Sequence, residues 1–153
     1  MLKLQWLNCF WLLIPILTWN VVFSSKLAHP AFEYDQAVPK WVLLLENVLR
    51  AAVMVLPLFM SMQWETSLNK IGVAVYLIGL LVYFASWIPL MYAPNSAWSN
   101  SLAGFLAPAY TPLLWLVGIG LIGDWWPYLA VSIVFVGVHI GHWGQVYALV
   151  MRK

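Results

Sequence analysis

Charged residues are scarce in this chain of 153 residues, which contains seven Lys and Arg, five Asp and Glu, and three His. They make up 8% of the sequence, against about 25% in soluble domains, and the mean hydropathy is +0.87. This leaves too little polar surface to cover a water-soluble globule, so we expect the lipid bilayer to be the solvent. The few cations form no run that follows a phosphate backbone, which argues against nucleic acid as a partner.

Cysteine is nearly absent as well. The single Cys9 excludes a disulfide within the chain and argues against a cage of thiolates around a metal. Because Cys9 lies in an apolar stretch, we interpret it as a small buried hydrophobic residue. Three histidines are too few for a di-iron desaturase or hydroxylase, and the zincin sequence HExxH is missing. The sequence therefore predicts no metal site.

Long apolar runs, by contrast, fill most of the chain. A helix needs roughly 20 residues to cross a hydrocarbon core of about 30 Å, because each residue rises about 1.5 Å. Five stretches meet this length and predict a single all-α domain, an integral membrane bundle of about five transmembrane helices: 5–24, 40–62, 70–92, 102–122 and 126–150. Several tryptophans fall at the expected ends, where an amphipathic ring prefers the headgroup layer: Trp41, Trp64, Trp98, Trp125 and Trp126.

The first of these runs also has features of a signal peptide, because Lys3 precedes it. Trp6, Trp11 and Trp19 are bulky for a cleaved segment, and no clean cleavage site follows, so we expect a retained helix.

Five crossings place the two termini on opposite sides of the membrane. The C-terminal side holds more cations than the N-terminal side, which holds Lys3 and Lys70. Cytoplasmic loops carry an excess of Lys and Arg. We therefore expect a cytoplasmic C-terminus and an N-terminus outside, from Lys26, Lys40, Arg152 and Lys153.

Ionisable side chains inside two of the spans are candidate functional residues, because such groups are costly in a membrane. Glu46 and Arg50 are four apart and share a helix face, with Asn47 between them. His139 and His142, three apart, share a face of the last span and are suited to a ligand, a haem edge or a proton path. The structural alternatives are that Glu46 and Arg50 only neutralise each other, and that the two histidines only pack against neighbouring groups.

The polar residues of the different spans fall at similar depths. Counted from the C-terminal side, the residues Glu46, Arg50, His139 and His142 lie roughly 9 to 16 Å deep. Five further residues lie in the same half of the bundle: Asn20, Tyr83, Ser86, Tyr110 and Thr111. We infer a polar cavity open toward the C-terminal side. Pro108 and Pro112 free backbone carbonyls near it.

Glycines recur in the last two expected spans, where they suit helix packing rather than chemistry. Gly137, Gly141 and Gly144 predict a small-residue surface for close helix packing. The segment 118–123 reads G-I-G-L-I-G and fits a dinucleotide fingerprint, but it lies inside an apolar span rather than after a strand, so we assign it no cofactor.

Several functions fit this pattern. The first is binding or transport of an apolar or amphiphilic small molecule, or of a proton-coupled solute, in the polar cavity, with Trp87, Trp115 and Trp143 as an aromatic wall. The second is an intramembrane enzyme acting on a lipid or isoprenoid, with a histidine or Glu46 as general base. A haem held through His139 or His142 fits poorly, because both lie on one helix.

The remaining hypothesis is a structural or assembly subunit, as a homo-oligomer or within a membrane complex, with Glu46 and Arg50 facing outward. In its length, its five expected spans and its abundant tryptophan, the chain is similar to the translocator protein family, which binds porphyrins and sterols. W-S-N-S at 98–101 is too short a match to carry over any site residue. The similarity favours ligand binding by analogy.

Overall fold

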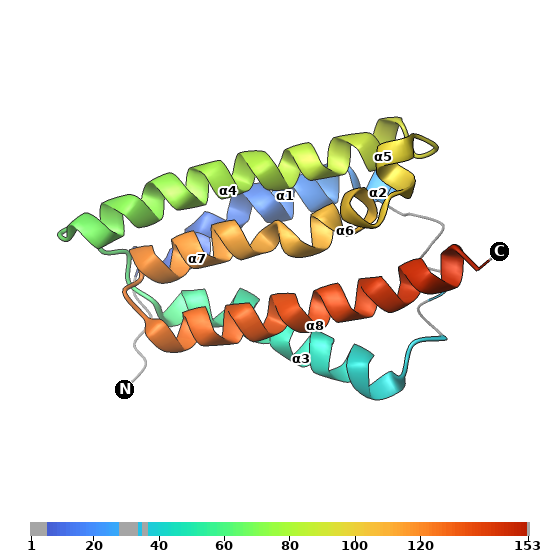
Figure 1. Cartoon of the computed structure of the whole chain (residues 1–153). Helices are drawn as coiled ribbons and strands as arrows, with labels where there is room; N and C mark the ends of the chain where they lie inside the picture. The colour runs from blue at the N-terminus through green and yellow to red at the C-terminus, as the bar shows by residue number, and fades with distance from the viewer. Residues whose placement is uncertain (1–5, 28–33, 35–36, 153) are drawn as a thin grey trace.

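The computed structural model describes residues 6–27, 34 and 37–152, and these residues form helices and no β-strand. The all-α fold class is therefore confirmed. Figure 1 shows the arrangement of the helices, which in chain order are η1 (Cys9–Leu13), α1 (Ile14–Val22), α2 (Ser24–Leu27), α3 (Lys40–Val55), η3 (Leu56–Phe59), α4 (Ser67–Tyr92), α5 (Ala97–Asn100), α6 (Leu102–Tyr110), α7 (Pro112–Ile122) and α8 (Trp126–Val150).

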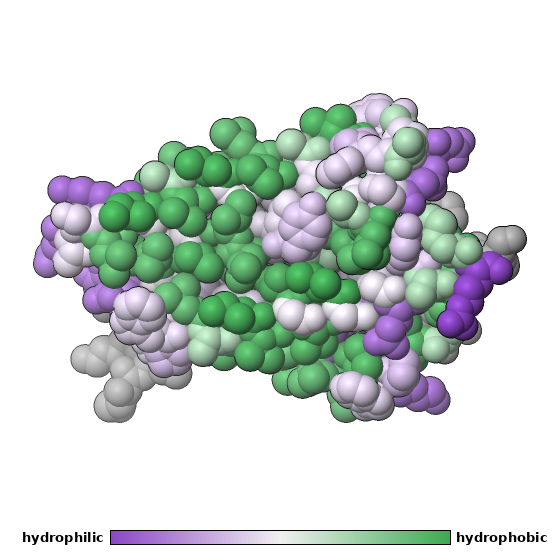
Figure 2. Space-filling model, viewed as in Figure 1, coloured by the Kyte–Doolittle hydropathy of each residue, from purple (hydrophilic) through white to green (hydrophobic). Residues whose placement is uncertain are grey.

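Four helical stretches within the described residues are long and apolar enough to cross a membrane: Lys40–Phe59, Ser67–Tyr92, Leu102–Ile122 and Trp126–Val150. The face in Figure 2 carries a hydrophobic middle between hydrophilic ends. This distribution is compatible with an integral membrane protein, because the hydrocarbon core accepts the apolar band and the headgroup layers accept the polar ends.

The expected first span, 5–24, is shorter than predicted, since its apolar helix covers only Cys9–Val22. The Asn8 side chain accepts from the amide of Phe10 and starts the helix at Cys9, and the α-helix ends at Phe23. The segment still runs along the bundle. The Cys9 amide donates to Met60 at one end, and Lys26 Nζ donates to Tyr92 Oη at the other, 3.1 Å away.

Two other predicted spans are interrupted where proline removes a backbone donor. The second span turns into the short 3-10 helix η3 at Pro57, and its last residues are extended beside the start of η1, where Met62 N donates to Leu7 O. The fourth span divides at Thr111, just before Pro112, into α6 and α7. The expected boundaries of the third and fifth spans, 70–92 and 126–150, agree with α4 and α8 to within three residues.

The helices form two layers, with α1, α4, α6 and α7 in one and α3 and α8 in the other (Figure 1). Within the first layer, α4 and α7 approach so closely that glycine is required. A Cβ on Gly79 would lie 2.5 Å from the backbone nitrogen of Trp115, and one on Gly118 would lie 2.5 Å from that of Tyr76. Small residues allow membrane helices to gain van der Waals contact in this way.

The small-residue surface predicted on the last span does not pack within the described chain. A Cβ built at Gly137, Gly141 or Gly144 meets nothing within 4 Å among the described residues. This face of α8 therefore has no partner within the described residues, because spacing alone does not tell which glycine face meets another helix of the chain. The G-I-G-L-I-G segment instead contributes Gly118 to the contact between α4 and α7.

Candidate functional site

A carboxylate on α3 connects this helix to two histidines on α8. Glu46 is 2% exposed, and its Oε1 lies 2.9 Å from Nδ1 of His139. Its Oε2 bonds Nδ1 of His142, and Arg50 Nη2, one turn further along α3, donates to Oε1. The spacings of four on α3 and three on α8 bring these groups to one face of each helix. The structure thus brings together the four ionisable residues that the sequence singles out.

The hydrogen bonds of Glu46 determine which ring nitrogen of His139 remains for other partners. An ionised carboxylate only accepts hydrogen bonds, so Nδ1 of His139 carries the hydrogen in this arrangement. In the neutral ring, Nε2 is then an acceptor on the opposite edge of the imidazole. His139 lines the adjoining cavity. The Glu46 and His139 pair therefore presents a basic nitrogen to the cavity.

Arg50 and Asn47 differ in their surroundings although they are neighbours on α3. Arg50 lines the cavity, and its side chain is 47% exposed, so the cavity reaches the surface of the protein at this residue. Asn47 is exposed on another face of α3 and does not line the cavity. The expectation that Asn47 joins the polar cluster is corrected, because a helix rotates by about 100° per residue.

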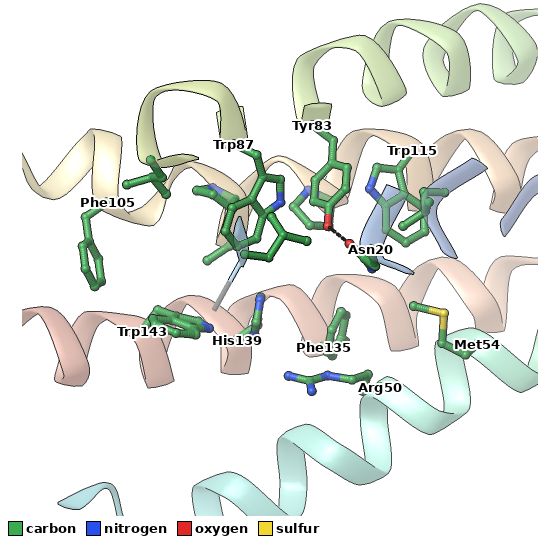
Figure 3. Close-up of a pocket in the computed structure, with 16 residues that line it drawn as sticks. Asn20, Arg50, Met54, Tyr83, Trp87, Phe105, Trp115, Phe135, His139 and Trp143 are labelled. Carbon is green, nitrogen blue, oxygen red and sulfur yellow. Dashed lines mark hydrogen bonds between the residues drawn. The ribbon is translucent and has the colours of Figure 1, made fainter. Parts of the chain in front are cut away.

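The cavity lies between the two helix layers and has a volume of about 330 Å³. Figure 3 shows Trp87, Tyr83 and Trp115 on one side of it, with Phe135, His139 and Trp143 of α8 facing them. All three tryptophans of the expected aromatic wall line the cavity. The wall is mostly apolar, and a few polar groups converge on it, as in small-molecule sites.

Two of these tryptophans, Trp87 and Trp115, carry a buried indole N–H that has no acceptor among the described residues. Trp115 is 2% exposed, and within the described part of the chain its Nε1 has no hydrogen-bond partner. An indole N–H only donates, and a buried donor left without a partner costs roughly 1–3 kcal/mol.

Two further residues from the sequence analysis line the cavity and bond to each other. Tyr83 Oη donates to Asn20 Oδ1 over 3.3 Å, joining α4 to α1. Asn20 keeps its amide N–H groups on the cavity side of the bundle. Arg50 lines the same cavity and adds guanidinium donors to it.

The other three polar residues named from the sequence do not line the cavity. Ser86 Oγ donates to the carbonyl of Tyr83 and lies 3.3 Å from Thr111 Oγ1, so both hydroxyls support the helices behind the wall. Tyr110 is 39% exposed, and its hydroxyl donates to the carbonyl of Ala103. Tyr110 therefore points away from the cavity, which its position along the chain does not indicate.

Sequence reasoning missed the apolar residues of the site other than its tryptophans. Phe105, Phe135 and Met54 line the cavity and were not distinguished from core residues. No signal in one sequence separates a cavity wall from a packed core, since both use the same residue types. His29, the third histidine, lies outside the described residues.

Residues 6–27, 34 and 37–152 contain no group of three or more His, Cys, Asp or Glu that is suited to hold a metal ion. His139 and His142 both address one carboxylate, so they do not face each other across a planar haem. Comparison of the chain with protein-family models, curated proteins and solved structures finds no match.

Proposed function

We propose that the protein binds an apolar or amphiphilic small molecule in the cavity between its two helix layers. The make-up of this cavity carries the proposal, because its mostly apolar wall is joined by a few polar side chains, Asn20, Arg50 and His139. The volume of about 330 Å³ is within the range of small-molecule sites, roughly 300–1,000 Å³. The opening at Arg50 gives such a molecule a way in from the surrounding lipid.

The position of Glu46 supports a ligand site over an assembly subunit. A subunit that contacts a partner chain through Glu46 and Arg50 needs both to face outward. Glu46 is buried and bonded to two histidines of its own chain, so only Arg50 is available at the surface. Glu46 therefore makes its contacts inside this chain rather than with a partner chain.

An intramembrane enzyme is the second candidate function. The bond between Glu46 and His139 is the observation that favours it, because a carboxylate that orients an imidazole is a common device of general-base catalysis. A reaction needs this base beside a bound lipid or isoprenoid. Binding is thus the step that both functions share, and it is the one to test first.

Filling the cavity tests the binding proposal. Ala109 lines the cavity and is 3% exposed, whereas Ala103 lies on the same helix and is exposed. We expect native mass spectrometry of the gently purified protein to show a bound apolar molecule. Ala109→Phe should lower the occupied fraction by roughly tenfold because its ring takes up the space. The matched control Ala103→Phe should retain the ligand.

Thermal unfolding of both variants checks that Ala109→Phe is folded, and Ala109→Leu is the smaller replacement if it is not. A wild-type protein that purifies empty and takes up no added palmitic acid, methyl palmitate or hexadecanol would refute the proposal. Equal occupancy in Ala109→Leu, Ala109→Phe and wild type would do so as well.

We also propose that the C-terminus is cytoplasmic. The two termini lie at opposite ends of the bundle (Figure 1), and the C-terminal end carries Lys26, Lys40 and Arg152 against Lys70 at the other end. A green fluorescent reporter fused after Lys153 should fluoresce, and an alkaline phosphatase fused there should be inactive. The reverse pair of results would invert the orientation.

A further inference from the structure

We propose that the ligand is a long-chain carboxylic acid, which enters as the neutral acid and transfers its proton to Nε2 of His139. This inference rests on the proposed binding function and names the chemical class of the ligand. In the transfer, the O–H bond of the acid breaks and an N–H bond forms on the imidazole. The electron pair stays on the carboxylate oxygen.

The geometry supplies a proton acceptor at the cavity wall. Nδ1 of His139 is held by Glu46 at 2.9 Å, which directs Nε2 away from the carboxylate. Figure 3 shows the ring pointing from α8 toward the facing helices. A carboxylate behind an imidazole also stabilises the imidazolium that forms when Nε2 takes a proton. Glu46 thus prepares His139 for this role.

The same cavity supplies donors for the carboxylate that remains. Arg50 has five N–H donors, of which the described bond to Glu46 uses Nη2. The N–H that forms on Nε2 of His139 is a second donor for the carboxylate. A carboxylate has two oxygens that accept such bonds, whereas an alcohol or an ester accepts more weakly. The apolar tail then lies against the aromatic wall.

Charge neutrality admits a monobasic acid and disfavours a dianion or a cation. With neutral imidazoles, Glu46 and Arg50 cancel, so the empty site has no net charge. After proton transfer, the site holds Glu46 and the ligand as anions, and Arg50 and His139 as cations, so it is again neutral. A dianionic phosphate would leave a net negative charge and an ammonium a net positive one, and an uncompensated charge in an apolar interior is strongly disfavoured.

Few other ionisable groups surround His139. Glu46 and Arg50 face it from α3, His142 lies one turn along α8 and bonds the second oxygen of Glu46, and Tyr83 lines the cavity from α4. Among the described cavity residues, α1, α2, α6 and α7 contribute no ionisable side chain. Among these groups, His139 is therefore the one that offers an acceptor nitrogen to the cavity.

Proton uptake on binding tests this inference. At pH 8 palmitic acid is largely ionised in water, so each molecule that binds as the carboxylate beside protonated His139 removes about one proton from solution. A pH indicator in weakly buffered detergent solution measures this uptake, and tritiated palmitic acid measures binding. We expect about one proton per bound acid in the wild type, and affinities for methyl palmitate and hexadecanol at least about tenfold weaker.

His139→Asn separates the proton from the binding. Its amide nitrogen keeps a donor for Glu46 but cannot take a proton, so uptake should fall to near zero and palmitic acid affinity by about tenfold or more. Ala103→Phe is the control and should retain both. If all three lipids bind equally, or if His139→Asn takes up protons like the wild type, the acid inference fails while the binding function stands. If none of them binds, the binding function fails.

Discussion

Glu46→Ala is expected to lower the free energy of unfolding by about 3 to 5 kcal/mol, the usual loss when one partner of a buried ionic network is removed. Glu46 is almost fully buried and bonds three side chains, from Arg50, His139 and His142. The alanine leaves their donors without an acceptor and removes the connection between α3 and α8. Unfolding by SDS in mixed micelles measures the loss.

Asn47→Ala is the matched control, because Asn47 is the next residue on α3 and is exposed. Its effect should stay within about 0.5 kcal/mol. The double variant Glu46→Ala with Arg50→Ala should recover part of the loss, since it also removes the unpaired cation. The recovery is expected to be small, about 1 kcal/mol, because Arg50 is half exposed and water screens its charge. Equal stability of Glu46→Ala and Asn47→Ala would contradict the network.

The polar cluster could be predicted from the sequence, because spacing along a helix follows directly from residue number. Positions 46 and 50 share a face of α3, and 139 and 142 share a face of α8. Counting about 1.5 Å per residue placed all four at one level, and the structure brings them together. An ionic group in an apolar span also has to find a partner, which limits the possible arrangements.

The direction in which a side chain points around its helix axis was harder to predict from the sequence. Asn47 and Tyr110 do not line the cavity, because the rotation of each helix is set by its neighbours rather than by its own sequence. The first helix is shorter than predicted for the same reason, because contacts with other segments set where it begins. It begins where Asn8 caps it and where residues beyond η3 pair with it, and these contacts join segments far apart in the chain.

The glycines show the same limit most clearly. Three glycines on α8 have the spacing of a packing surface but meet no described residue within 4 Å, whereas Gly79 and Gly118, on separate helices, permit the close approach of α4 and α7. A repeat along one helix is visible in sequence. A pair of single glycines on two helices is not, because their meeting depends on the register between α4 and α7.

Gly118→Ala and Gly79→Ala are each expected to lower the free energy of unfolding by about 1 to 3 kcal/mol, the range for forcing an extra carbon into a packed contact. The new Cβ would lie 2.5 Å from a backbone nitrogen of the facing helix, of Tyr76 for Gly118 and of Trp115 for Gly79. Backbone atoms cannot rotate away as a side chain does, so α4 and α7 must separate along their contact.

Gly137→Ala is the matched control on α8, because its Cβ meets none of the described residues within 4 Å. Since alanine is the better helix former, this variant should be as stable as the wild type or up to about 1 kcal/mol more stable. SDS unfolding compares the three variants. Gly79→Ala carries a second expectation: it displaces Trp115, which lines the cavity, so palmitic acid binding should weaken more in this variant than in Gly118→Ala. Destabilisation by Gly137→Ala equal to that by Gly118→Ala would contradict the tight contact between α4 and α7. Equal palmitic acid binding in Gly79→Ala and Gly118→Ala would show that the position of Trp115 does not depend on that contact.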